Sequence, residues 1–234
     1  MKAVLDHIED TAANIKTFWF KPERSVHQTA GQFTELYLPH QQSDNRGDKR
    51  WFTLSNSPAD KLLSITTKYA GESSSSFKKY LFSLQPGAPV SLADPMGDFV
   101  LPKDTSIPIV YVAGGIGVTP IHSMVKYLLG ANEKRNITLI YAVNHQDELA
   151  FGELFQNSDI KYIPVVKEPG PGWTGEVGTV TTERILSAMR PSEQSLVYLS
   201  GPEPMVEALA DALKKAGVSK NRIVTDFFPG YTSI

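Results

Sequence analysis

The stretch Ile109-Val110-Tyr111-Val112-Ala113-Gly114-Gly115-Ile116-Gly117-Val118-Thr119-Pro120 decides the fold of the second half of this 234-residue chain. It opens on a continuous apolar run, which is typical of a parallel strand buried on both faces. Three glycines in four residues follow and predict a tight turn. Thr119 and Pro120 come next, where a hydroxyl can cap a helix and proline suits the first helical turn. We therefore expect a strand, a turn and a helix in succession.

The same alternation continues on the carboxyl side of this stretch. Short apolar runs rich in Val, Ile and Tyr predict strands, and amphipathic segments between them predict helices. The strands are expected over 107–113, 137–143, 162–166, 196–199 and 223–227, and the helices over 120–129, 150–156, 182–189 and 204–216. Strands that alternate with helices predict a parallel sheet covered on both faces, which is an α/β domain.

The first hundred residues follow a different pattern, in which short strands are separated by Pro, Gly, Asn and Asp. Strands are expected over 4–9, 16–20, 34–38, 51–55, 62–69 and 90–93, with one helix over 75–84. Many short strands with a single helix predict an antiparallel β-barrel. The pattern changes within 100–106, so we expect a barrel domain over 1–103 and an α/β domain over 104–234.

Composition excludes several classes of function. The net charge of −2 and the scattered basic residues give no reason to expect a nucleic-acid partner. The absence of cysteine excludes disulfides, thiolate zinc sites and a self-contained iron–sulfur cluster. The five histidines are isolated in sequence, so no metal site is expected. Early charges argue against a signal peptide and no apolar run approaches ~18–20 residues, so we expect a cytoplasmic protein with no membrane insertion.

Residues 50–53, Arg50-Trp51-Phe52-Thr53, put three useful groups on one predicted strand. An arginine can fork onto phosphate oxygens, an aromatic ring can stack on a flat heterocycle, and a hydroxyl can bond to a ring nitrogen. Arg50 and Phe52 lie two residues apart and so share a face. The alternative is an exposed arginine beside core aromatics, and for this segment alone that alternative is favoured.

Three other segments have the chemistry to hold phosphate or a ligand. A glycine-rich turn into a helix start, as in 114–120, offers amide donors and the positive end of the helix dipole to a dinucleotide pyrophosphate. The four serines of 73–76 precede a helix and can act in the same way, or can simply cap it. Residues 200–205 end a buried strand, where ligands bind in open parallel sheets. Each segment is also compatible with an ordinary turn or cap, and the aromatic 225–231 with core packing.

Taken together and in this order, these segments resemble the ferredoxin–NADP reductase superfamily, which joins an FAD-binding barrel to an NAD(P)-binding α/β domain. The resemblance implies that Arg50 grips the FAD pyrophosphate, Phe52 stacks on the isoalloxazine ring and Thr53 reaches flavin N5. Phenylalanine stands where the family usually has tyrosine. The second flavin segment of the family is similar to 71–77. The implied flavin-binding set is completed by Trp51, Thr67, Ser75 and Ser76.

The resemblance also implies the nicotinamide side of the site. The family segment Gly-Gly-x-Gly-x-Thr-Pro is similar to 114–120, and Cys-Gly-Pro-x-x-Met is similar to 200–205, with serine in place of cysteine. A C-terminal aromatic often covers the flavin in the family, and Phe228 is the candidate here, with Asp226 as a nearby carboxylate. The implied nucleotide-binding residues are Gly115, Gly117, Val118, Thr119, Pro120, Gly201, Pro202, Met205 and, for a 2′-phosphate, Lys167.

The function implied is an FAD-dependent oxidoreductase that takes a hydride from NADH or NADPH and passes electrons to a separate carrier such as a ferredoxin. Thr53 and Ser200 would orient the reacting atoms, and Asp226 could relay a proton. A bulky residue at Gly117 is expected to block nicotinamide nucleotide binding and to leave flavin binding normal. Because residues 173–180 resemble stand-alone members, an NAD(P)H:flavin reductase that uses free flavin stays open. A flavin-holding subunit of a larger complex and a flavin-free interaction module are further alternatives.

Overall fold

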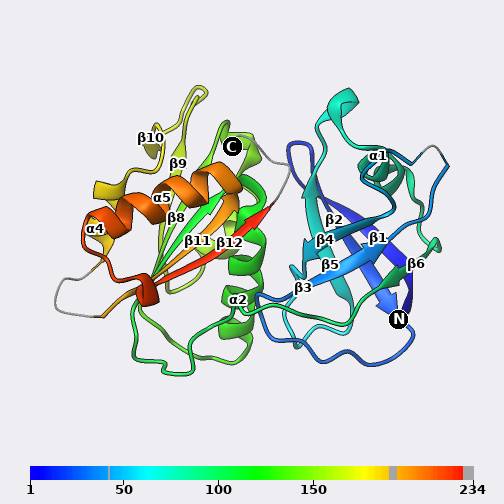
Figure 1. Cartoon of the computed structure of the whole chain (residues 1–234), viewed down its shortest axis with the longest axis horizontal. Helices are drawn as coiled ribbons and strands as arrows, with labels where there is room; N and C mark the ends of the chain where they lie inside the picture. The colour runs from blue at the N-terminus through cyan, green and yellow to red at the C-terminus, as the bar shows by residue number, and fades with distance from the viewer. Residues whose placement is uncertain (42, 190–193, 229–234) are drawn as a thin grey trace.

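The computed structural model describes residues 1–41, 43–189 and 194–228 and contains two six-stranded sheets (Figure 1). Every strand of the first sheet comes from residues 2–92, and every strand of the second comes from residues 109–228. The segment 93–108 connects the two. The expected boundary after Lys103 falls in this segment and stays a prediction.

The first sheet is antiparallel and follows the order β4-β3-β6-β1-β2-β5. Its two edge strands meet, because Leu54 bridges Ile65 and the Ser55 amide donates to the Ser64 carbonyl at 2.8 Å. This closure makes the sheet a barrel, as the sequence predicts. Its strands are β1(Lys2–Ala12), β2(Ile15–Pro22), β3(Phe33–Tyr37), β4(Lys49–Thr53), β5(Leu63–Lys68) and β6(Pro89–Leu92).

The barrel buries an apolar interior that the one predicted helix covers. Helix α1 (Ser76–Ser83) follows the short 3-10 turn η1 (Gly71–Ser73) and buries Phe77 and Leu81. These two side chains join a cluster that includes Phe18, Phe20 and Leu36 from the strands. Alternation of apolar and polar residues along the strands therefore points one face inward, as expected for a barrel wall.

The second sheet is entirely parallel, with the order β10-β9-β8-β7-β11-β12. One face packs on α2 through Tyr111 and Tyr198, and the other packs on α5 through Val112 and Leu199. This confirms the predicted α/β architecture. Its elements are β7(Ile109–Gly114), α2(Thr119–Gly130), β8(Ile137–Val143), α3(Gly152–Gln156), β9(Lys161–Val166), β10(Glu176–Val177), α4(Thr182–Ala188), β11(Leu196–Pro202), α5(Glu203–Lys215) and β12(Ile223–Phe228), with 3-10 turns η2(Gly115–Val118), η3(Gln146–Glu148) and η4(Lys220–Arg222).

Two local features differ from the sequence prediction. The edge strand β10 is only two residues long, which is too short for a periodicity signal. Thr119 does not cap α2 with its hydroxyl, because its Oγ1 donates to the Ile116 carbonyl at 3.0 Å, inside the preceding 3-10 turn. Pro120 does lie in the first turn of α2, as predicted.

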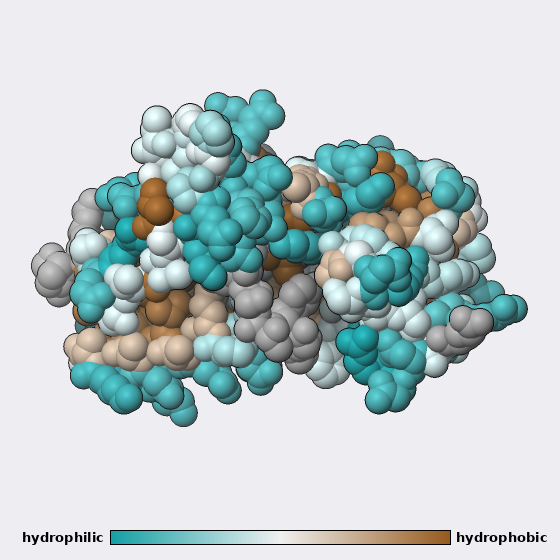
Figure 2. All heavy atoms as spheres, turned by 90° about the horizontal axis from the view of Figure 1, so that it is seen from above, coloured by the Kyte–Doolittle hydropathy of each residue, from teal (hydrophilic) through white to brown (hydrophobic). Residues whose placement is uncertain are grey.

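Helix α2 stands between the parallel sheet and the barrel (Figure 1). Further contacts cross between the two halves: Lys68 Nζ donates to Glu148 Oε1 at 2.6 Å, and the Ala13 amide donates to the Asp147 carbonyl at 2.8 Å. Figure 2 shows a largely hydrophilic surface with hydrophobic atoms on both lobes and beside the crease between them. Within the described residues, every helix is too short or too polar to cross a bilayer.

Candidate functional site

The carboxyl ends of β7 and β11 form the centre of the candidate site. These neighbouring strands lie where the strand order reverses, since β8 to β10 extend from β7 on one side and β12 from β11 on the other. Ligands of open parallel sheets bind at this kind of switch point. The turn 114–120 follows β7, and residues 200–205 form the end of β11 and the start of α5. The structure therefore brings these two sequence motifs together.

Close packing at the switch point explains why glycine is needed there. A Cβ on Gly117 would lie 2.3 Å from the Ser200 carbonyl oxygen, and one on Gly201, where φ is +153°, would lie 3.1 Å from Gly114 Cα. Gly117 thus lets the turn approach β11. That a larger residue at Gly117 blocks nicotinamide nucleotide binding stays a prediction, and the added side chain would also collide with the backbone of β11.

The turn itself exposes little of its surface. Val118, Thr119 and Pro120 are buried, as is Gly117, whereas Gly115 is half-buried and has a φ of +52°. Among the predicted contacts of 115–120, Gly115 therefore offers its backbone most openly to a ligand. Met205 lies beneath the turn, because a Cβ on Gly114 would meet its sulfur at 2.6 Å.

Ser200 combines complete burial with an unpaired hydroxyl. Within the described residues its Oγ has no hydrogen-bond partner, and the residue exposes none of its surface. It pairs with Ala113 on one neighbouring strand and with Asp226 on the other. Because Tyr198 faces α2 and side chains alternate along a strand, Ser200 and Asp226 also point to the α2 side, where the barrel lies. Burial raises the pKa of the Asp226 carboxyl to about 6.

Phe228 is the next residue on the same face of β12 and pairs with Pro202. It is half-buried, so an aromatic ring lies beside the Ser200–Asp226 pair at the end of the sheet. The remaining residues of the predicted aromatic tail, 229–231, lie outside the described residues. Lys167 follows β9, is exposed, and donates its amide to the Val143 carbonyl at 3.0 Å.

On the barrel, the aromatic residues of the Arg50 strand point to opposite faces. Phe52 is buried and stacks on Phe77 with ring centroids 6.0 Å apart, so its ring belongs to the barrel core in this arrangement. Trp51 is 64% exposed and contacts Phe33 on the outer face. Thr53 and Thr67 are both buried. Stacking of Phe52 on a flavin ring stays a prediction.

Both terminal nitrogens of the Arg50 guanidinium contact the polar loop that precedes β4. Its Nη1 donates to the carbonyls of Arg46, Gly47 and Lys49 at 2.6–3.0 Å. Its Nη2 lies 3.4 Å from Asp44 Oδ1, and the guanidinium sits over the Phe77 ring. Burial lowers the pKa of Arg50 and the Asp44 carboxylate raises it.

Asp44 also holds the amino end of α1. Its carboxylate accepts from the Ser76 amide at 3.2 Å, and its own amide donates to Ser76 Oγ at 2.9 Å. Burial acts to raise the Asp44 pKa, but hydrogen bonds from Arg46 and Ser76 outweigh it and bring the value to about 2. Ser75 caps the helix by accepting from the Lys78 amide at 3.2 Å. An anion at this place thus meets Arg50 and a helix N-terminus, the donor set that suits a diphosphate.

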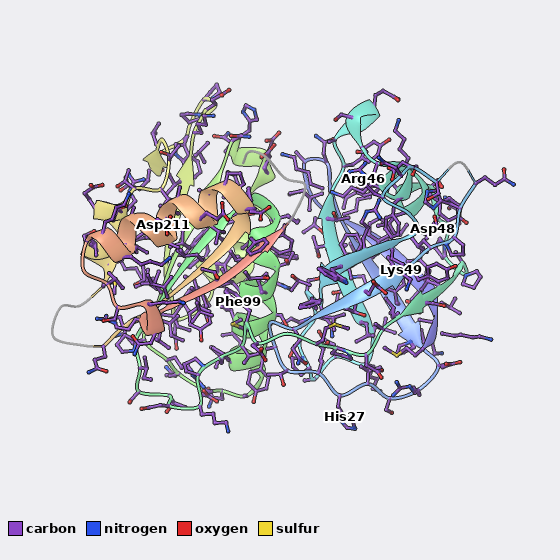
Figure 3. The ribbon with its side chains drawn as sticks, in the orientation of Figure 1. His27, Arg46, Asp48, Lys49, Phe99 and Asp211 are labelled. Carbon is purple, nitrogen blue, oxygen red and sulfur yellow. The ribbon has the colours of Figure 1, made fainter. Side chains whose placement is uncertain are left out.

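Figure 3 locates this cluster within the molecule. Arg46, Asp48 and Lys49 lie on the part of the barrel away from the parallel sheet, and Phe99 lies near α2. Because Arg50 donates to the Arg46 carbonyl, its cluster also lies on this part of the barrel, away from the parallel sheet that carries Ser200. An extended ligand, with its phosphates on the barrel and a ring toward α2, has the shape to reach from one to the other.

The two halves of the site are joined by residues that no sequence motif selected. His122 Nδ1 lies 2.7 Å from the Ser55 carbonyl, and Ser123 Oγ donates to the Asn56 carbonyl at 2.6 Å. In the sequence His122 was one of five isolated histidines. Its position two residues after Pro120, on the helix that opens at the glycine turn, was the one available signal.

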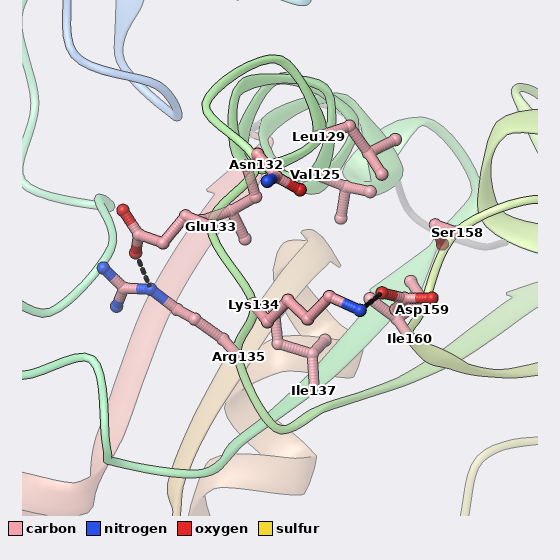
Figure 4. A pocket seen from close by; sticks show the side chains of 11 residues that line it. Val125, Leu129, Asn132, Glu133, Lys134, Arg135, Ile137, Ser158, Asp159 and Ile160 are labelled. Carbon is pink, nitrogen blue, oxygen red and sulfur yellow. Dashed lines mark hydrogen bonds and ion pairs between the residues drawn. The ribbon is translucent and has the colours of Figure 1, made fainter.

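A separate hollow lies at the amino ends of the parallel strands, between the end of α2 and the start of β8 (Figure 4). Its rim carries the Lys134–Asp159 ion pair at 2.8 Å and the Arg135–Glu133 pair at 2.6 Å. None of the predicted site residues lines it. It is therefore unrelated to the switch point.

Comparison with known proteins agrees with this geometry. Residues 111–211 match the family model described as the oxidoreductase NAD-binding domain. NADH-cytochrome b5 reductase 1 of Aspergillus terreus is 33% identical over 159 residues, which cover 63% of this chain and 54% of that protein. The chain spans about three fifths or less of the length of the first curated relatives that it matches.

Solved structures share the whole fold. The flavohem-like FAD/NAD binding domain of nitric oxide dioxygenase from Vibrio cholerae superposes with a TM-score of 0.84 at 21% identity, covering 97% of this chain and 98% of that one. A ferredoxin NADP+ reductase from Neisseria gonorrhoeae, solved with bound FAD and NADP, gives a TM-score of 0.79 at 18% identity over 97% and 98% of the two chains. At these identities the likeness establishes the fold.

Proposed function

We propose that this chain is a member of the ferredoxin–NADP reductase superfamily, an FAD-dependent oxidoreductase that takes a hydride from NADH or NADPH and passes electrons to a separate acceptor. The observation that carries the proposal is the pair Ser200 and Asp226. A buried unpaired hydroxyl and a half-buried carboxyl, whose pKa is raised by burial, lie side by side at the switch point and face the barrel. A structural core gains nothing from such a pair, since an unpaired buried polar group costs about 1–3 kcal/mol.

The residues of the chain take defined roles in this proposal. Arg50, Ser75 and Ser76 hold the flavin diphosphate, and Phe52, Thr53 and Thr67 line the ring side of that site. The backbone of 115–120 and residues 201–205 hold the nicotinamide nucleotide. When bound, FAD supplies the redox chemistry, accepting a hydride and releasing electrons. Ser200 orients the nicotinamide, Asp226 holds or moves a proton, and Phe228 excludes water from the reacting face.

The test begins with flavin binding and reduction. The purified chain should bind FAD with a measurable dissociation constant by calorimetry, and anaerobic NADH or NADPH should bleach the bound flavin. Arg50→Ala should weaken FAD binding by roughly 1.5–3 kcal/mol because a charged phosphate contact is lost. Arg24→Ala, at an arginine that pairs with Asp94 on the barrel surface, is the matched control and should leave the affinity unchanged. Absence of flavin binding by the wild-type chain would overturn the proposal.

A flavin reductase is the second candidate, and one observation favours it. The donors of Arg50 and the Ser76 amide already have partners within the chain, which a flavin diphosphate has to displace. Flavin that exchanges during gel filtration, with turnover that saturates in free flavin, would identify this activity. Flavin that stays bound, with NAD(P)H-dependent ferricyanide reduction, would identify the first.

The acceptor is the finer part of the proposal. We propose a small redox carrier protein of the ferredoxin type, or free flavin in the second candidate. Carriers should be compared by the rate at which the reduced protein is reoxidised without oxygen. We also propose that Lys167 meets a 2′-phosphate, so Lys167→Ala should raise the apparent Kd for NADPH and leave that for NADH unchanged.

A further inference from the structure

Helix α2 touches both halves of the candidate site. It begins at Thr119, directly after the turn that we propose for the nicotinamide nucleotide. Its first turns then contact the barrel, where His122 Nδ1 meets the Ser55 carbonyl at 2.7 Å and Ser123 Oγ donates to the Asn56 carbonyl at 2.6 Å. Ser55 lies two residues after Thr53, on the continuation of the proposed flavin strand.

The acceptors of these two bonds belong to rigid backbone. Ser55 and Asn56 are completely buried, and Ser55 continues the ladder to Ser64 that closes the barrel. The Asn56 side chain fixes its own segment, because its Oδ1 accepts from the Ser64 amide at 2.8 Å and its Nδ2 donates to the Ser57 carbonyl at 3.0 Å. If α2 shifted, these two carbonyls could not move with it, and the hydrogen bonds would break.

His122 is held from its other side as well. Its ring stacks on Phe151 with centroids 3.7 Å apart and planes 18° apart. Phe151 has a φ of +60°, an uncommon conformation for a bulky residue, which tertiary packing has to hold in place. A carbonyl oxygen only accepts, so Nδ1 must carry the ring proton. Burial lowers the pKa of His122 to about 4, so the imidazole is neutral above that pH.

We infer that His122 and Ser123 are positioning residues that fix the distance between the nicotinamide and flavin sites. The inference rests on the proposed function. Hydride transfer needs the reacting atoms about 3–3.5 Å apart, and a misplacement of 1 Å can cost about 100-fold in rate. A helix that starts at one nucleotide and is bonded to the strand of the other is a rigid spacer of fixed length.

Two ion pairs also cross the interface between the barrel and the parallel-sheet half, and they differ from the buried hydrogen bonds of His122 and Ser123. Lys126 Nζ lies 2.7 Å from Asp60 Oδ2, and Lys68 Nζ lies 2.6 Å from Glu148 Oε1. The Lys126–Asp60 pair is partly exposed on both sides, and pairs of this kind contribute little net free energy and tolerate changes in geometry. The two buried hydrogen bonds to main-chain carbonyls set the spacing, and Lys126→Gln serves as an interface control.

Amide side chains provide a matched test at His122. The amide nitrogen introduced by His122→Asn would lie near the position of Nδ1, whereas the longer side chain in His122→Gln places its amide near Nε2. Anaerobic stopped-flow reduction of bound FAD across nucleotide concentrations separates the limiting rate from the apparent Kd. His122→Gln and Ser123→Ala should lower the limiting rate by about 10- to 100-fold with little change in Kd. His122→Asn and Lys126→Gln should stay close to wild type.

A second readout does not depend on activity. The chain contains no cysteine, so Lys21→Cys on the barrel and Lys215→Cys on α5, both exposed, can be spin-labelled specifically. Pulsed dipolar spectroscopy of the ligand-free protein should show a broader distance distribution in His122→Gln than in His122→Asn or wild type. Should His122→Gln fold poorly, Ser123→Ala, which removes one oxygen, decides the question by the same two measurements.

The outcomes separate this inference from the proposed function. Wild-type rates and wild-type distance distributions in both His122→Gln and Ser123→Ala would overturn the positioning role. Parallel losses in His122→Asn and His122→Gln would also overturn it, since the donor position would then not matter. If wild-type flavin is not reduced by NADH or NADPH at all, the proposed function fails, and the distance measurement alone still tests the spacer.

Discussion

Asp44 is the residue whose role changes most between sequence and structure. In the sequence it belongs to a polar loop, but in the fold its carboxylate binds the α1 amino end and lies beside Arg50. Sequence reasoning selected Arg50 and the serines of 75–76 as an anion-binding set, and the fold gathers them in one place. It could not reveal that the chain supplies an anion of its own, because that contact depends on how the loop 41–49 folds back.

Removal of this carboxylate should therefore strengthen flavin binding. Asp44→Asn keeps the size of the side chain but removes the charge that competes with a diphosphate for Arg50 and the Ser76 amide. We expect FAD to bind about 3- to 10-fold more tightly by calorimetry. Asp10→Asn, at an exposed carboxylate that pairs with Lys16 elsewhere on the barrel, is the matched control. Weaker binding in Asp44→Asn would mean that the carboxylate supports the flavin site.

Ser200 shows a conflict between stability and function at a single residue. Its unpaired buried hydroxyl costs free energy in the folded state, so Ser200→Ala should raise the free energy of unfolding by about 1 kcal/mol. The same change should slow flavin reduction, because the group that orients the nicotinamide is lost. Urea denaturation and stopped-flow reduction on the same samples check both parts. A destabilised Ser200→Ala would show that the hydroxyl has a structural partner.

At the scale of elements, the local patterns were sufficient for most of the fold. The six barrel strands, α1, and the alternation of strands and helices after residue 107 follow from apolar periodicity and from Gly and Pro punctuation. Strand β10 was missed because two residues carry no period. The inward burial of Phe52 agrees with the core aromatics that the Arg50 segment favours when taken alone, and its stacking on a flavin ring stays a prediction.

The packing of the turn 114–120 against β11 predicts how a side chain at Gly117 changes the stability of the protein. Gly117→Ala places a Cβ 2.3 Å from the Ser200 carbonyl, so the turn and strand must separate. We expect a loss of about 3 kcal/mol or more in unfolding free energy, within the range for overpacked cores and strained backbone. Gly130→Ala, at the end of α2 where nothing lies within 4 Å of the added Cβ, should be neutral or stabilising.

Thermal and chemical denaturation of both variants measure this difference. Equal stability of Gly117→Ala and Gly130→Ala would show that the turn can move away from β11 at little cost. In that case larger residues at Gly117 would act through a bound nucleotide alone.

At the scale of the whole molecule, the buried His122 and the half-buried Asp226 should oppose each other in the pH dependence of stability. His122 has a pKa lowered to about 4 from 6.5, so its contribution is complete above pH 6.5 and is lost as the pH falls toward 4. Asp226 has a pKa raised to about 6 from 3.8, so its contribution is complete below pH 3.8 and is lost as the pH rises through 6. Each is worth up to about 3 kcal/mol, with opposite sign.

In the wild-type protein, the changes in stability with pH that His122 and Asp226 cause should nearly cancel. Relative to wild type, Asp226→Asn should become more stable as the pH rises from 4 to 6.5, and His122→Asn should become less stable over the same interval. Urea denaturation at half-unit pH steps measures both trends. Parallel pH profiles for all three proteins would show that neither group titrates in this interval.

The two buried hydrogen bonds that His122 and Ser123 make with the barrel divide donors and acceptors unequally between the two halves of the chain. Both donors are side chains of the α/β half, and both acceptors are main-chain carbonyls of the barrel half. Main-chain carbonyls persist whatever side chains the barrel carries, so mutation of the barrel surface cannot remove them while its strands keep their course. In chimaeras, this α/β half should therefore dock on a foreign barrel of the same fold, whereas this barrel would depend on its new partner to bring its own donors.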